Sequence, residues 1–480
     1  MAALAAVARG LLVQGLELYS DEAYYWLWSR RPAFGYFDHP PMVAWLVGIS
    51  SALVPGETGV RLLFFVCGGL AVGFAALTAR ELSSDPDAPL LAALLAAAAP
   101  LLNLTGALAL PDAPVEAAYA AATWLLSRAR GRGWLAVAVP VGLALLSKYT
   151  AALLAPALVL LVAWDGELRR ELRRPWPWAA ALIATAIFAP CLAWNAGHAF
   201  ASIRFQLQHG FGGAFSAQAF LQYLGALALG PGPAVTALGI AGLVRARSSA
   251  EKRVAAVTLF PLAVTTVSAL RGPVEANWAA LVYPGLCAAA GAALCRMSPR
   301  PARAIAMASL LLGLALAGGF ALEVREPRLA PVASPVVERL HGWREFAQRA
   351  RRAAEQGCAV LGSPPGCDGR DPFVFTFNYQ QAGELAFYAG WRRFGPAQEG
   401  PRASQLDVWG ETPAPGEPFL YVGIRGLDDE PRRRWRGEGQ GPTLSFDVSF
   451  RGEVLRTAAV TPFSRFVRLE PRRPGGLQSR

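Results

Sequence analysis

The sequence has few charged residues for its length. Only 16% of its 480 residues are Asp, Glu, Lys or Arg, whereas 54% are hydrophobic, and its mean hydropathy is +0.33. This balance argues against a soluble enzyme of that length and predicts a polytopic membrane protein. The four histidines and six cysteines show no CxxC or histidine-rich spacing, so we expect no metal site. We also find no clear internal repeat.

The net charge is the one feature that could suggest a nucleic-acid partner. It amounts to +11, but the arginines sit in short clusters between apolar runs. Anionic lipid and membrane topology account for such clusters. We therefore expect a lipid bilayer as partner and no nucleic acid.

The apolar runs predict about eleven membrane spans, several of them short for a bilayer. The first is the weakest, because Arg9 and Gln14 interrupt it. The predicted spans lie near Ala2–Leu18, Val60–Leu82, Pro89–Leu110, Ala113–Ser127, Trp134–Ser147, Thr150–Trp164, Trp178–Trp194, Ala217–Val244, Val254–Leu270, Trp278–Cys295 and Ala304–Leu322.

The positions of the basic residues predict the orientation, since Lys and Arg accumulate on the cytoplasmic side. If each apolar segment spans once, four basic loops share that side, and the N-terminus is cytoplasmic. The loop at 19–58 then lies outside, together with polar spots at Asp112, Lys148 and Asn277. The basic loops contain Arg128, Arg130 and Arg132; Arg169, Arg170, Arg173 and Arg174; Arg245, Arg247, Lys252 and Arg253; and Arg296, Arg300 and Arg303.

The character of the chain changes after Leu322. Charged residues become frequent, and the segments PFVFTF, PFLYVGI, LSFDVSF and RFVRLE read as strands separated by Gly/Pro turns. We expect a transmembrane domain at 1–322 and a small α+β soluble domain at 323–480. An external location of this second domain would permit a disulfide between Cys358 and Cys367.

The segment Asp21–Pro41, DEAYYWLWSRRPAFGYFDHPP, combines acids, aromatics and a histidine between two apolar runs. The spacing of Asp21, Tyr25 and Trp28 places them on one helical face, so a carboxylate would lie beside aromatic rings at the bilayer boundary. Two plainer readings stay open. Ser20 could cap a helix whose first turn contains the acids, and the rings could form an ordinary interfacial belt.

Three further polar residues have both a functional and a structural reading. Asp112, between two prolines, is costly near lipid and could face a functional path, or it could be a helix N-terminal charge. Lys148 could bind phosphate or simply reach the membrane interface. His39, in Asp38-His39-Pro40-Pro41, could be an ordinary loop residue or an imidazole held near an anion, because the prolines restrict the backbone there.

These residues resemble a known family, the GT-C glycosyltransferases of the protein O-mannosyltransferase type, which includes the lipid A aminoarabinose transferases and Rgt-like bacterial enzymes. The resemblance rests on DEAYYWLW…GYFDHPP, PDAP, GLALLSKYT, WNAGHAFASIRFQLQHG and ANW, in that order. It covers about Asp21 to Tyr283, and HGWREF and YQQAGELAFY extend it loosely into the tail.

The resemblance implies an inverting transferase at the outer face of a bacterial inner membrane. It would move a sugar from a polyprenyl-phosphate carrier to a hydroxyl of lipopolysaccharide or lipid A, another glycan or a protein, without a cofactor or catalytic metal. In the family the first external loop carries the catalytic acid, which falls on Asp21, with Glu22 beside it. The lipid A enzymes usually have Glu-Lys-Pro-Pro where this chain has Asp38-His39-Pro40-Pro41, and there the lysine holds the donor phosphate.

We therefore expect the following site. The predicted catalytic residues are Asp21, Glu22 and Asp112. Asp21 is the general base, Glu22 is its neighbour in the same motif, and Asp112 is a second acid that positions acceptor or sugar. The donor-phosphate candidates are cationic or can become so. The aromatic and amide candidates would stack on the sugar, line the lipid entrance or hydrogen-bond hydroxyls. The predicted substrate-binding residues are Tyr25, Trp28, Asp38, His39, Lys148, Tyr149, Arg204, Asn277 and Trp278.

Two other functions remain to be weighed. A lipid or lipid-linked sugar flippase would suit many spans with intramembrane charges, but transporters tend to show repeats and polar groups near the midplane. A noncatalytic envelope-assembly protein would leave the motifs of Asp21 and Asp112 unexplained.

Overall fold

A computed structural model describes residues 1–211, 213–327, 335–364, 366–367, 371–397, 402–424 and 434–470. Contacts divide the chain into two units. Unit 1 comprises Met1–Gln14 and Ala33–Ala321, and unit 2 comprises Gly15–Pro32 and Leu322–Arg480. The predicted domains place all of 1–322 together. The structure instead groups Gly15–Pro32 with the C-terminal part, because helix α2 (Ser20–Ser29) packs on helix α20 (Tyr379–Tyr388).

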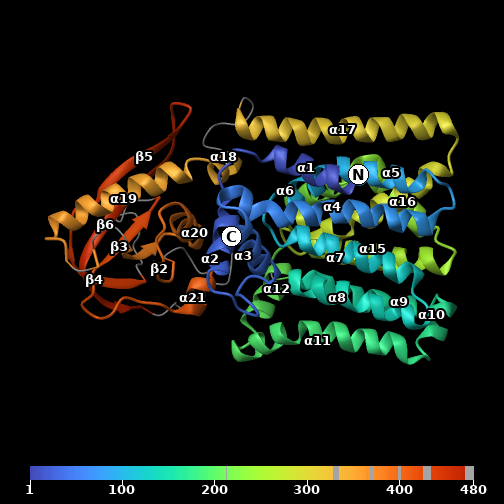
Figure 1. Ribbon diagram of the computed structural model, residues 1–480, viewed down its shortest axis with the longest axis horizontal. Coiled ribbons are helices and arrows are strands. Elements are labelled where there is room, and N and C mark those ends of the chain that lie inside the picture. Colours follow the sequence, from blue (N-terminus) through green and yellow to red (C-terminus); the bar gives the residue numbers. More distant parts are fainter. Residues whose placement is uncertain are drawn as a thin grey trace. The chain divides into compact units, whose positions relative to one another are not determined.

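Unit 1 is helical, and in Figure 1 its longer helices run side by side. Three short 3-10 turns (Gly131–Trp134, Tyr149–Leu153 and Ala276–Val282) precede α8, α9 and α16. The helices are α1 (Ala2–Leu12), α3 (Met42–Leu53), α4 (Gly56–Leu82), α5 (Ala88–Ala98), α6 (Pro100–Ala107), α7 (Asp112–Arg128), α8 (Leu135–Ser147), α9 (Leu154–Leu161), α10 (Gly166–Glu171), α11 (Pro175–Gly197), α12 (Ala201–Phe211), α13 (Ala217–Leu229), α14 (Pro233–Val244), α15 (Ser249–Ala269), α16 (Tyr283–Cys295) and α17 (Pro299–Arg325).

The apolar helices make this a polytopic membrane protein. Among the described residues, four helical stretches are long and apolar enough to span a bilayer, or up to six if each of two bent pairs is one span. The predicted count of about eleven is not confirmed. The four stretches are Gly56–Leu82, Pro175–Gly197, Ala276–Cys295 and Pro299–Arg325. The last has many exposed apolar side chains, including Leu311, Leu314 and Leu322, as a helix facing lipid requires.

Two predicted spans are each broken into two helices. Pro89–Leu110 bends by 66° between α5 and α6, where Pro100 opens the second helix, and Ala217–Val244 bends by 85° between α13 and α14. At the second break Gly232 has φ of +105° and Pro233 begins α14. Proline lacks an N–H for the preceding helix, and glycine tolerates positive φ, so both breaks follow from local sequence. Helix α3 was not predicted, and it lies inside the loop 19–58 that was expected to be external.

Arg9, which weakens the first predicted span, is fully buried in unit 1. Its Nε donates to the carbonyl of Leu102 at 3.2 Å. A Cβ at Gly106 would lie 2.7 Å from that Nε, and one at Gly68 would lie 3.0 Å from it. The two glycines therefore create the space in which a guanidinium fits between helices, and α1 packs inward despite its charge.

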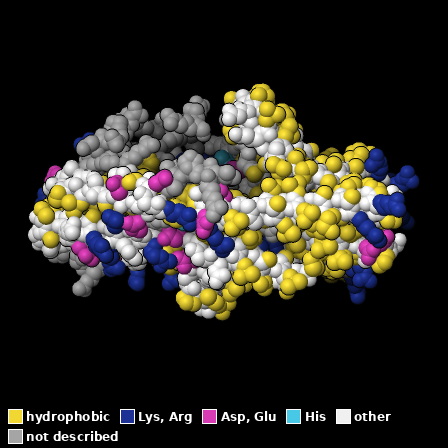
Figure 2. All heavy atoms as spheres, turned by 90° about the horizontal axis from the view of Figure 1, so that it is seen from above, with side chains coloured by type: hydrophobic (Ala, Val, Ile, Leu, Met, Phe, Trp, Pro, Cys, Tyr) yellow, Lys and Arg dark blue, Asp and Glu magenta, His cyan; other side chains and the backbone are white. Residues whose placement is uncertain are grey.

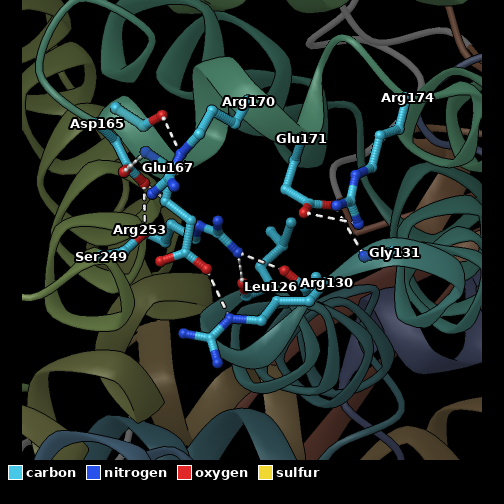
Figure 3. A network of polar contacts seen from close by, with 12 residues as sticks. Leu126, Arg130, Gly131, Asp165, Glu167, Arg170, Glu171, Arg174, Ser249 and Arg253 are labelled. Atoms are coloured by element: carbon cyan, nitrogen blue, oxygen red, sulfur yellow. Dashed lines mark hydrogen bonds and ion pairs between the residues drawn. The ribbon is translucent and has the colours of Figure 1, made fainter.

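A polar network holds one end of unit 1 together (Figure 3). At its centre is Arg253, a buried residue in the first turns of α15. Its Nη1 donates to the carbonyls of Leu126 and Ala129 at 3.1 and 2.7 Å, and its Nε lies 3.3 Å from Oδ2 of Asp165. The same Oδ2 accepts a hydrogen bond from Ser249. Arg253 thus joins the end of α7 to α10 and to the start of α15.

The surrounding loops extend this network. Arg130 pairs with Glu167, Glu171 accepts from the N–H of Gly131, and Arg296 lies 3.4 Å from Glu251. The four basic loops predicted to share one side therefore meet at one end of unit 1, which we call the arginine end. Figure 2 shows Lys and Arg side chains gathered at the right-hand end, beyond a mainly hydrophobic surface.

The carboxylates of the arginine end are held in their charged form. Burial alone would raise the pKa of Asp165, but hydrogen bonds from Ser249 and from backbone N–H groups, with the charge of Arg253, lower it. The hydrogen bond from Arg130 similarly lowers the pKa of Glu167. A guanidinium and several donors favour the ionised carboxylate, so the network is charged at neutral pH.

Unit 2 consists of α2, a mixed six-stranded sheet and helices beside it. The strand order is β2-β1-β3-β6-β4, and β5 also pairs with β6. β1 is parallel to β2 and β3, whereas β6 is antiparallel to β3, β4 and β5. The elements are α18 (Pro335–Leu340), α19 (Trp343–Val360), β1 (Phe373–Thr376), α20, β2 (Arg393–Phe394), α21 (Gln405–Trp409), β3 (Phe419–Gly423), β4 (Trp435–Gln440), β5 (Leu444–Phe450) and β6 (Glu453–Leu469).

The predicted strands coincide with β1, β3, β5 and the end of β6, which confirms the α+β character of the tail. Alternation along each strand separates two faces. In β3, Leu420 and Val422 join the cluster that contains α19 and α20, whereas Phe419 and Tyr421 join an aromatic cluster on the other side. β2 and β4 were not foreseen, since β2 is two residues long and β4 reads WRGEGQ, with little apolar alternation.

Two features fix the outer helix of this sheet. Cys358, near the end of α19, forms a disulfide with Cys367, so the bond that the sequence left open is present. At the other end of α19, the guanidinium of Arg456 lies 3.7 Å from the ring centroid of Trp343 and donates to the carbonyls of Glu338 and His341. Burial lowers the pKa of Arg456 to about 10, against the attraction of Glu384, Glu338 and Glu17.

Replacing Arg253 should destabilise the protein strongly. Arg253→Met leaves two carbonyls without their donor and the carboxylate of Asp165 without its cation, and breaking a buried pair costs about 3–5 kcal/mol. Arg130→Ala is the matched control, because it removes an exposed ion pair worth less than about 1 kcal/mol. Thermal unfolding of the detergent-solubilised protein checks both. Equal midpoints for the two variants would contradict the role assigned to Arg253.

Unit 2 should lose stability on mild acidification through His341. Its Nε2 lies 2.8 Å from the carbonyl of Val324, and its ring stacks on Phe450 at 4.2 Å. Burial, with the charges of Arg451 and Arg456, lowers its pKa below the ordinary 6.5. A folded pKa below the unfolded value means that stability is present above about pH 6.5 and falls as pH drops through the folded pKa.

The measurement is the thermal midpoint of wild type and His341→Gln between pH 7.5 and 5. Wild type should lose more of its midpoint over this range than the variant, which has no imidazole to protonate. Parallel curves for the two proteins would show that His341 does not carry this dependence.

Candidate active site

Asp21 lies in the first turn of α2, within unit 2. Its Oδ1 accepts a hydrogen bond from Nε2 of Gln380, on α20, at 2.9 Å. The residue is half-buried, so the carboxylate is neither enclosed nor freely solvated. A carboxylate held by a neutral donor at a partly open position can accept a proton from a hydroxyl.

Glu22, which follows Asp21 in the predicted motif, has a structural role. It is fully buried, and its Oε2 accepts a hydrogen bond from the backbone N–H of Tyr19 at 2.8 Å. Tyr19 is the N-cap of α2, so Glu22 closes the first turn as the glutamate of a capping box does. The cap therefore falls one residue before Ser20, the expected position, because Glu22 reaches back to Tyr19.

The aromatic residues of α2 pack on one another. The ring centroid of Trp28 lies 4.8 Å from that of Tyr24 and 4.9 Å from that of Tyr25, both edge-on. Trp28 is fully buried, and Tyr25 is 6% exposed. The two rings predicted to face a sugar thus form the packed interior of this segment, and their contact with a sugar stays a prediction.

In unit 1, three predicted residues meet at the first turn of α7. Oδ1 of Asp112 lies 2.7 Å from Nζ of Lys148, and its Oδ2 accepts a hydrogen bond from Asn277 at 2.9 Å. Asp112 and Lys148 are 2% and 7% exposed. Lys148 is therefore a buried ion-pair partner and does not reach for the membrane interface. Asp112 is also the first residue of α7, which confirms its helix-terminal reading, while its role in a reaction site stays a prediction.

Tyr149 is part of a second polar group, next to this triad in sequence. Its hydroxyl donates to Oγ of Ser202 at 3.0 Å and accepts from Nδ2 of Asn195 at 3.0 Å. The backbone carbonyl of Asn195 in turn accepts from the N–H of Phe200, which like Ala199 has positive φ. Asn195 thus holds the tight turn that joins α11 to α12. Tyr149 is hydrogen-bonded to Asn195, before this turn, and to Ser202, after it.

Helix α12 connects the remaining predicted residues of unit 1. Gln206 donates to the backbone carbonyl of Asp38 at 2.6 Å, and Phe205 packs on Phe37. At the other end of α12, His209 lies 5.2 Å from Trp278, centroid to centroid. Helix α12 therefore contacts both Trp278 and the loop that carries Asp38.

The two remaining candidates differ in exposure. His39 is half-buried in the turn Ala33–Pro41, which is closed by a hydrogen bond from the N–H of Tyr36 to the carbonyl of His39. Arg204 lies on α12 between Ser202 and Phe205, but its side chain is exposed. An exposed guanidinium can meet an anion from outside, whereas Lys148 can do so only beside Asp112.

The predicted site thus falls into two groups, one in each unit. Asp21, Glu22, Tyr25 and Trp28 belong to unit 2, and Asp112, Lys148 and Asn277 meet in unit 1. The second group lies at the end of α7 opposite the arginine end. Sixteen residues separate Asp112 from Arg128, or about 24 Å at the usual helical rise.

Sequence reasoning missed three polar residues that support these groups. Glu116, one turn after Asp112 on α7, is fully buried and accepts a hydrogen bond from Thr105 at 3.1 Å. The spacing Asp-x-x-x-Glu was a usable signal, because i and i+4 share a helix face. Asn195 and Gln380 could not be chosen from the sequence, since their partners Tyr149 and Asp21 are far away along the chain.

Among the described residues, no group of three or more His, Cys, Asp or Glu side chains is arranged to hold a metal ion. The absence of a cofactor remains an expectation. The donors that the structure does gather are an ammonium, amides and hydroxyls, which suit phosphate and sugar oxygens.

The fold of the chain is that of the GT-C glycosyltransferases. Its structure is similar to that of ArnT from Cupriavidus metallidurans in the apo state, with a TM-score of 0.64 and 16% identity over 96% of each chain. ArnT bound to undecaprenyl phosphate gives a TM-score of 0.63, with the same identity and coverage. The oligosaccharyltransferase AglB from Archaeoglobus fulgidus, in complex with an inhibitory peptide and a dolichol-phosphate, gives 0.51 at 14% identity, covering 82% of this chain and 63% of that one.

At the level of sequence, residues 38–194 match the family described as dolichyl-phosphate-mannose-protein mannosyltransferase. The chain matches no curated protein sequence. The family match and the ArnT-like fold confirm the predicted resemblance to GT-C glycosyltransferases of the protein O-mannosyltransferase type. The ArnT match also extends over the tail, where the sequence motifs were only loosely similar.

Lys148→Met should destabilise the protein more than its size suggests. It leaves Asp112 as a buried carboxylate without its cation, and such a loss costs about 3–5 kcal/mol. The double variant Asp112→Asn with Lys148→Met should recover part of this loss, because no buried charge remains. Thermal unfolding of Lys148→Met, Asp112→Asn and the double variant checks the ion pair. A double variant as unstable as the sum of the single variants would contradict it.

Proposed function

We propose that this protein is an inverting glycosyltransferase. It takes a sugar from a polyprenyl-phosphate carrier and transfers it to a hydroxyl acceptor of the cell envelope, at the periplasmic face of the bacterial inner membrane. The acceptor class comprises lipopolysaccharide or lipid A, another glycan or a protein. No metal ion or other cofactor takes part in this proposal.

The observation that carries the proposal is the ArnT-like fold over nearly the whole chain. One of the two matching ArnT structures contains undecaprenyl phosphate, and the AglB structure contains a dolichol-phosphate. A polyprenyl phosphate is a good leaving group. The protein must then deprotonate the acceptor hydroxyl and neutralise the departing phosphate. The reaction therefore requires at least a base and a group of cationic or amide donors.

The chain offers both kinds of group. Asp21, held by Gln380 and half-buried, is the proposed base. In unit 1, Lys148 and Asn277 present an ammonium and an amide around Asp112. His39 and Arg204 are further candidates for the donor phosphate. In this scheme Asp112 keeps Lys148 charged and in place, and Trp278 lines the approach of the sugar or lipid.

The proposed orientation follows from the two ends of unit 1. The arginine end carries the basic loops, which favours the cytoplasm, so the Asp112 end would face the periplasm. The disulfide Cys358–Cys367 supports an oxidising location for unit 2. These two observations are independent, since one concerns membrane loops and the other a soluble domain.

The rival function is a flippase for a lipid or a lipid-linked sugar. Buried charges in unit 1, such as Arg9, would be compatible with it. A flippase has no need of a carboxylate base, so the two functions respond differently when Asp21 loses its charge.

The test is transfer of radiolabelled sugar from a panel of synthetic polyprenyl-phosphate sugars to membrane acceptors, with purified protein in nanodiscs. Asp21→Asn should lower transfer by about a hundredfold or more, because removing a general base costs 10²–10⁴ in rate. The matched control is Asp447→Asn, an isosteric change at an exposed aspartate of unit 2 that bonds Thr457; it should transfer at the wild-type rate.

Two results would contradict the proposal. Full transfer by Asp21→Asn would remove the assigned base. Carrier movement across the bilayer by wild type in proteoliposomes, with no label transfer from any donor, would favour the flippase.

A further inference from the structure

Helix α2 is fixed in unit 2 by close packing on α20. A Cβ at Gly383 would lie 2.6 Å from the backbone N of Tyr24, so only glycine allows the two helices to approach this closely. The rings of Tyr24 and Tyr379 lie 4.4 Å apart. Packing on α20 therefore fixes the position of α2 within unit 2.

Hydrogen bonds from other parts of unit 2 reinforce this packing. The N–H of Leu18 donates to the hydroxyl of Tyr388 at 2.9 Å, and the N–H of Gln405 donates to the hydroxyl of Tyr24 at 2.7 Å. Further along, Arg31 makes two hydrogen bonds to the carboxylate of Glu411, at 2.8 and 3.0 Å. The segment that carries Asp21 is thus anchored before, within and after α2.

Gln380 and Gly383 act on the same face of α20, and Asp21 and Tyr24 on the same face of α2, because each pair is three residues apart. The glycine contact brings the helices together, and the amide of Gln380 then reaches Oδ1 of Asp21 at 2.9 Å. Two residues of one turn of α20 thereby determine where the carboxylate lies and which way it points.

We infer that Gln380 is a positioning residue for the reaction, an inference that rests on the proposed function. Its amide N–H holds the carboxylate of Asp21 ionised and oriented toward the acceptor. In the reaction, that carboxylate takes the proton of the acceptor hydroxyl. The hydroxyl oxygen forms a bond to the anomeric carbon, and the bond from that carbon to the phosphate oxygen breaks, so that polyprenyl phosphate leaves with the electron pair.

The choice of a neutral donor has a chemical reason. A hydrogen bond to the ionised form favours it, as a cation would. A full positive charge in direct contact would make the carboxylate a weaker base, and general-base efficiency follows basicity. An amide orients the group while leaving most of its proton affinity in place, and it does not itself titrate.

Other charged and titratable groups of unit 2 interact with this carboxylate or adjoin the Asp21–Gln380 pair in the sequence. Arg339, from α18, donates to the hydroxyl of Tyr19 at the N-cap of α2, and its charge interacts with Asp21. Tyr379 lies beside Gln380 on α20, and Glu22 follows Asp21 on α2. These groups are common to all the variants below, so differences among the variants report on position 380.

The experiment compares wild type with three full-length variants in nanodiscs, using the polyprenyl-phosphate sugar that wild type accepts. Gln380→Leu removes the donor, and Gln380→Glu keeps the shape but adds a negative charge. Gln381→Leu is the matched control, because Gln381 is the next residue on α20 and accepts from the N–H of Phe377. The readouts are kcat, KM for the donor, the pH profile of kcat and the thermal midpoint.

Gln380→Leu should lower kcat about tenfold, because the carboxylate loses a hydrogen bond to its charged form, and leave KM unchanged. The acid limb of its pH profile should move to higher pH, because a carboxylate without its donor protonates more readily. Gln380→Glu should move that limb further, through like-charge repulsion. Gln381→Leu should lower the thermal midpoint without moving the limb.

Some outcomes overturn the inference and leave the proposed function intact. If Asp21→Asn is inactive but both Gln380 variants keep the wild-type kcat and acid limb, Gln380 does not position the base. A lowered midpoint with an unmoved limb in Gln380→Leu would assign it a structural role only. If wild type transfers no sugar from any donor, the proposed function fails first and takes the inference with it.

Discussion

Charged side chains enclosed by apolar helices have to find their partners within the protein, and this constraint shapes unit 1 at both ends. At the arginine end, Arg253 satisfies two carbonyls and a carboxylate that would otherwise lie buried and unpaired. At the opposite end, Asp112 does the same for Lys148 and Asn277. Leaving any of these groups alone would cost several kcal/mol, so the helices that carry them must meet where they do.

The two ends nevertheless use this constraint differently. The guanidinium of Arg253 is bound by two backbone carbonyls, which cannot change their charge, and by the carboxylate of Asp165, and the result is a fixed joint between α7, α10 and α15. Lys148 and Asp112 are two side chains that can make further hydrogen bonds. Lys148 is followed in the chain by Tyr149, which belongs to a group of hydroxyls and amides. The same physical need thus produces a structural joint on one side and, on the other, the polar group that we propose faces the donor phosphate.

Much of this arrangement is predictable from sequence, for reasons tied to particular elements. Long apolar runs between arginine clusters give the helices of unit 1, and alternation in PFVFTF and PFLYVGI gives β1 and β3. The motif Pro111-Asp112 singles out a carboxylate that cannot face lipid. Glycine and proline explain the bend at Gly230–Pro233, but hydropathy alone reads the run Ala217–Val244 as one span, and no apolar alternation marks the two-residue strand β2.

Contacts across long stretches of chain are equally invisible. Nothing near Gln380 signals that it meets Asp21, and nothing near Arg9 signals that Gly68 and Gly106 leave room for it. The grouping of Gly15–Pro32 with the C-terminal part follows from such contacts. A boundary drawn where the composition changes, at Leu322, cannot detect it, because composition does not show which distant segments pack together.

The pairing of α2 with α20 also affects how the protein is made. Gln380 follows Asp21 by 359 residues, which takes roughly 20–70 s at synthesis rates of about 5–20 residues per second. During that interval α2 has left the ribosome, but α20, on whose Gly383 it packs, has not yet been synthesised. Until α20 is made, Tyr24 lacks the ring of Tyr379 against which it packs in the folded protein. A chain that stops early, or a translocation machinery that holds back the last domain, would leave the membrane helices in place but without an ordered α2.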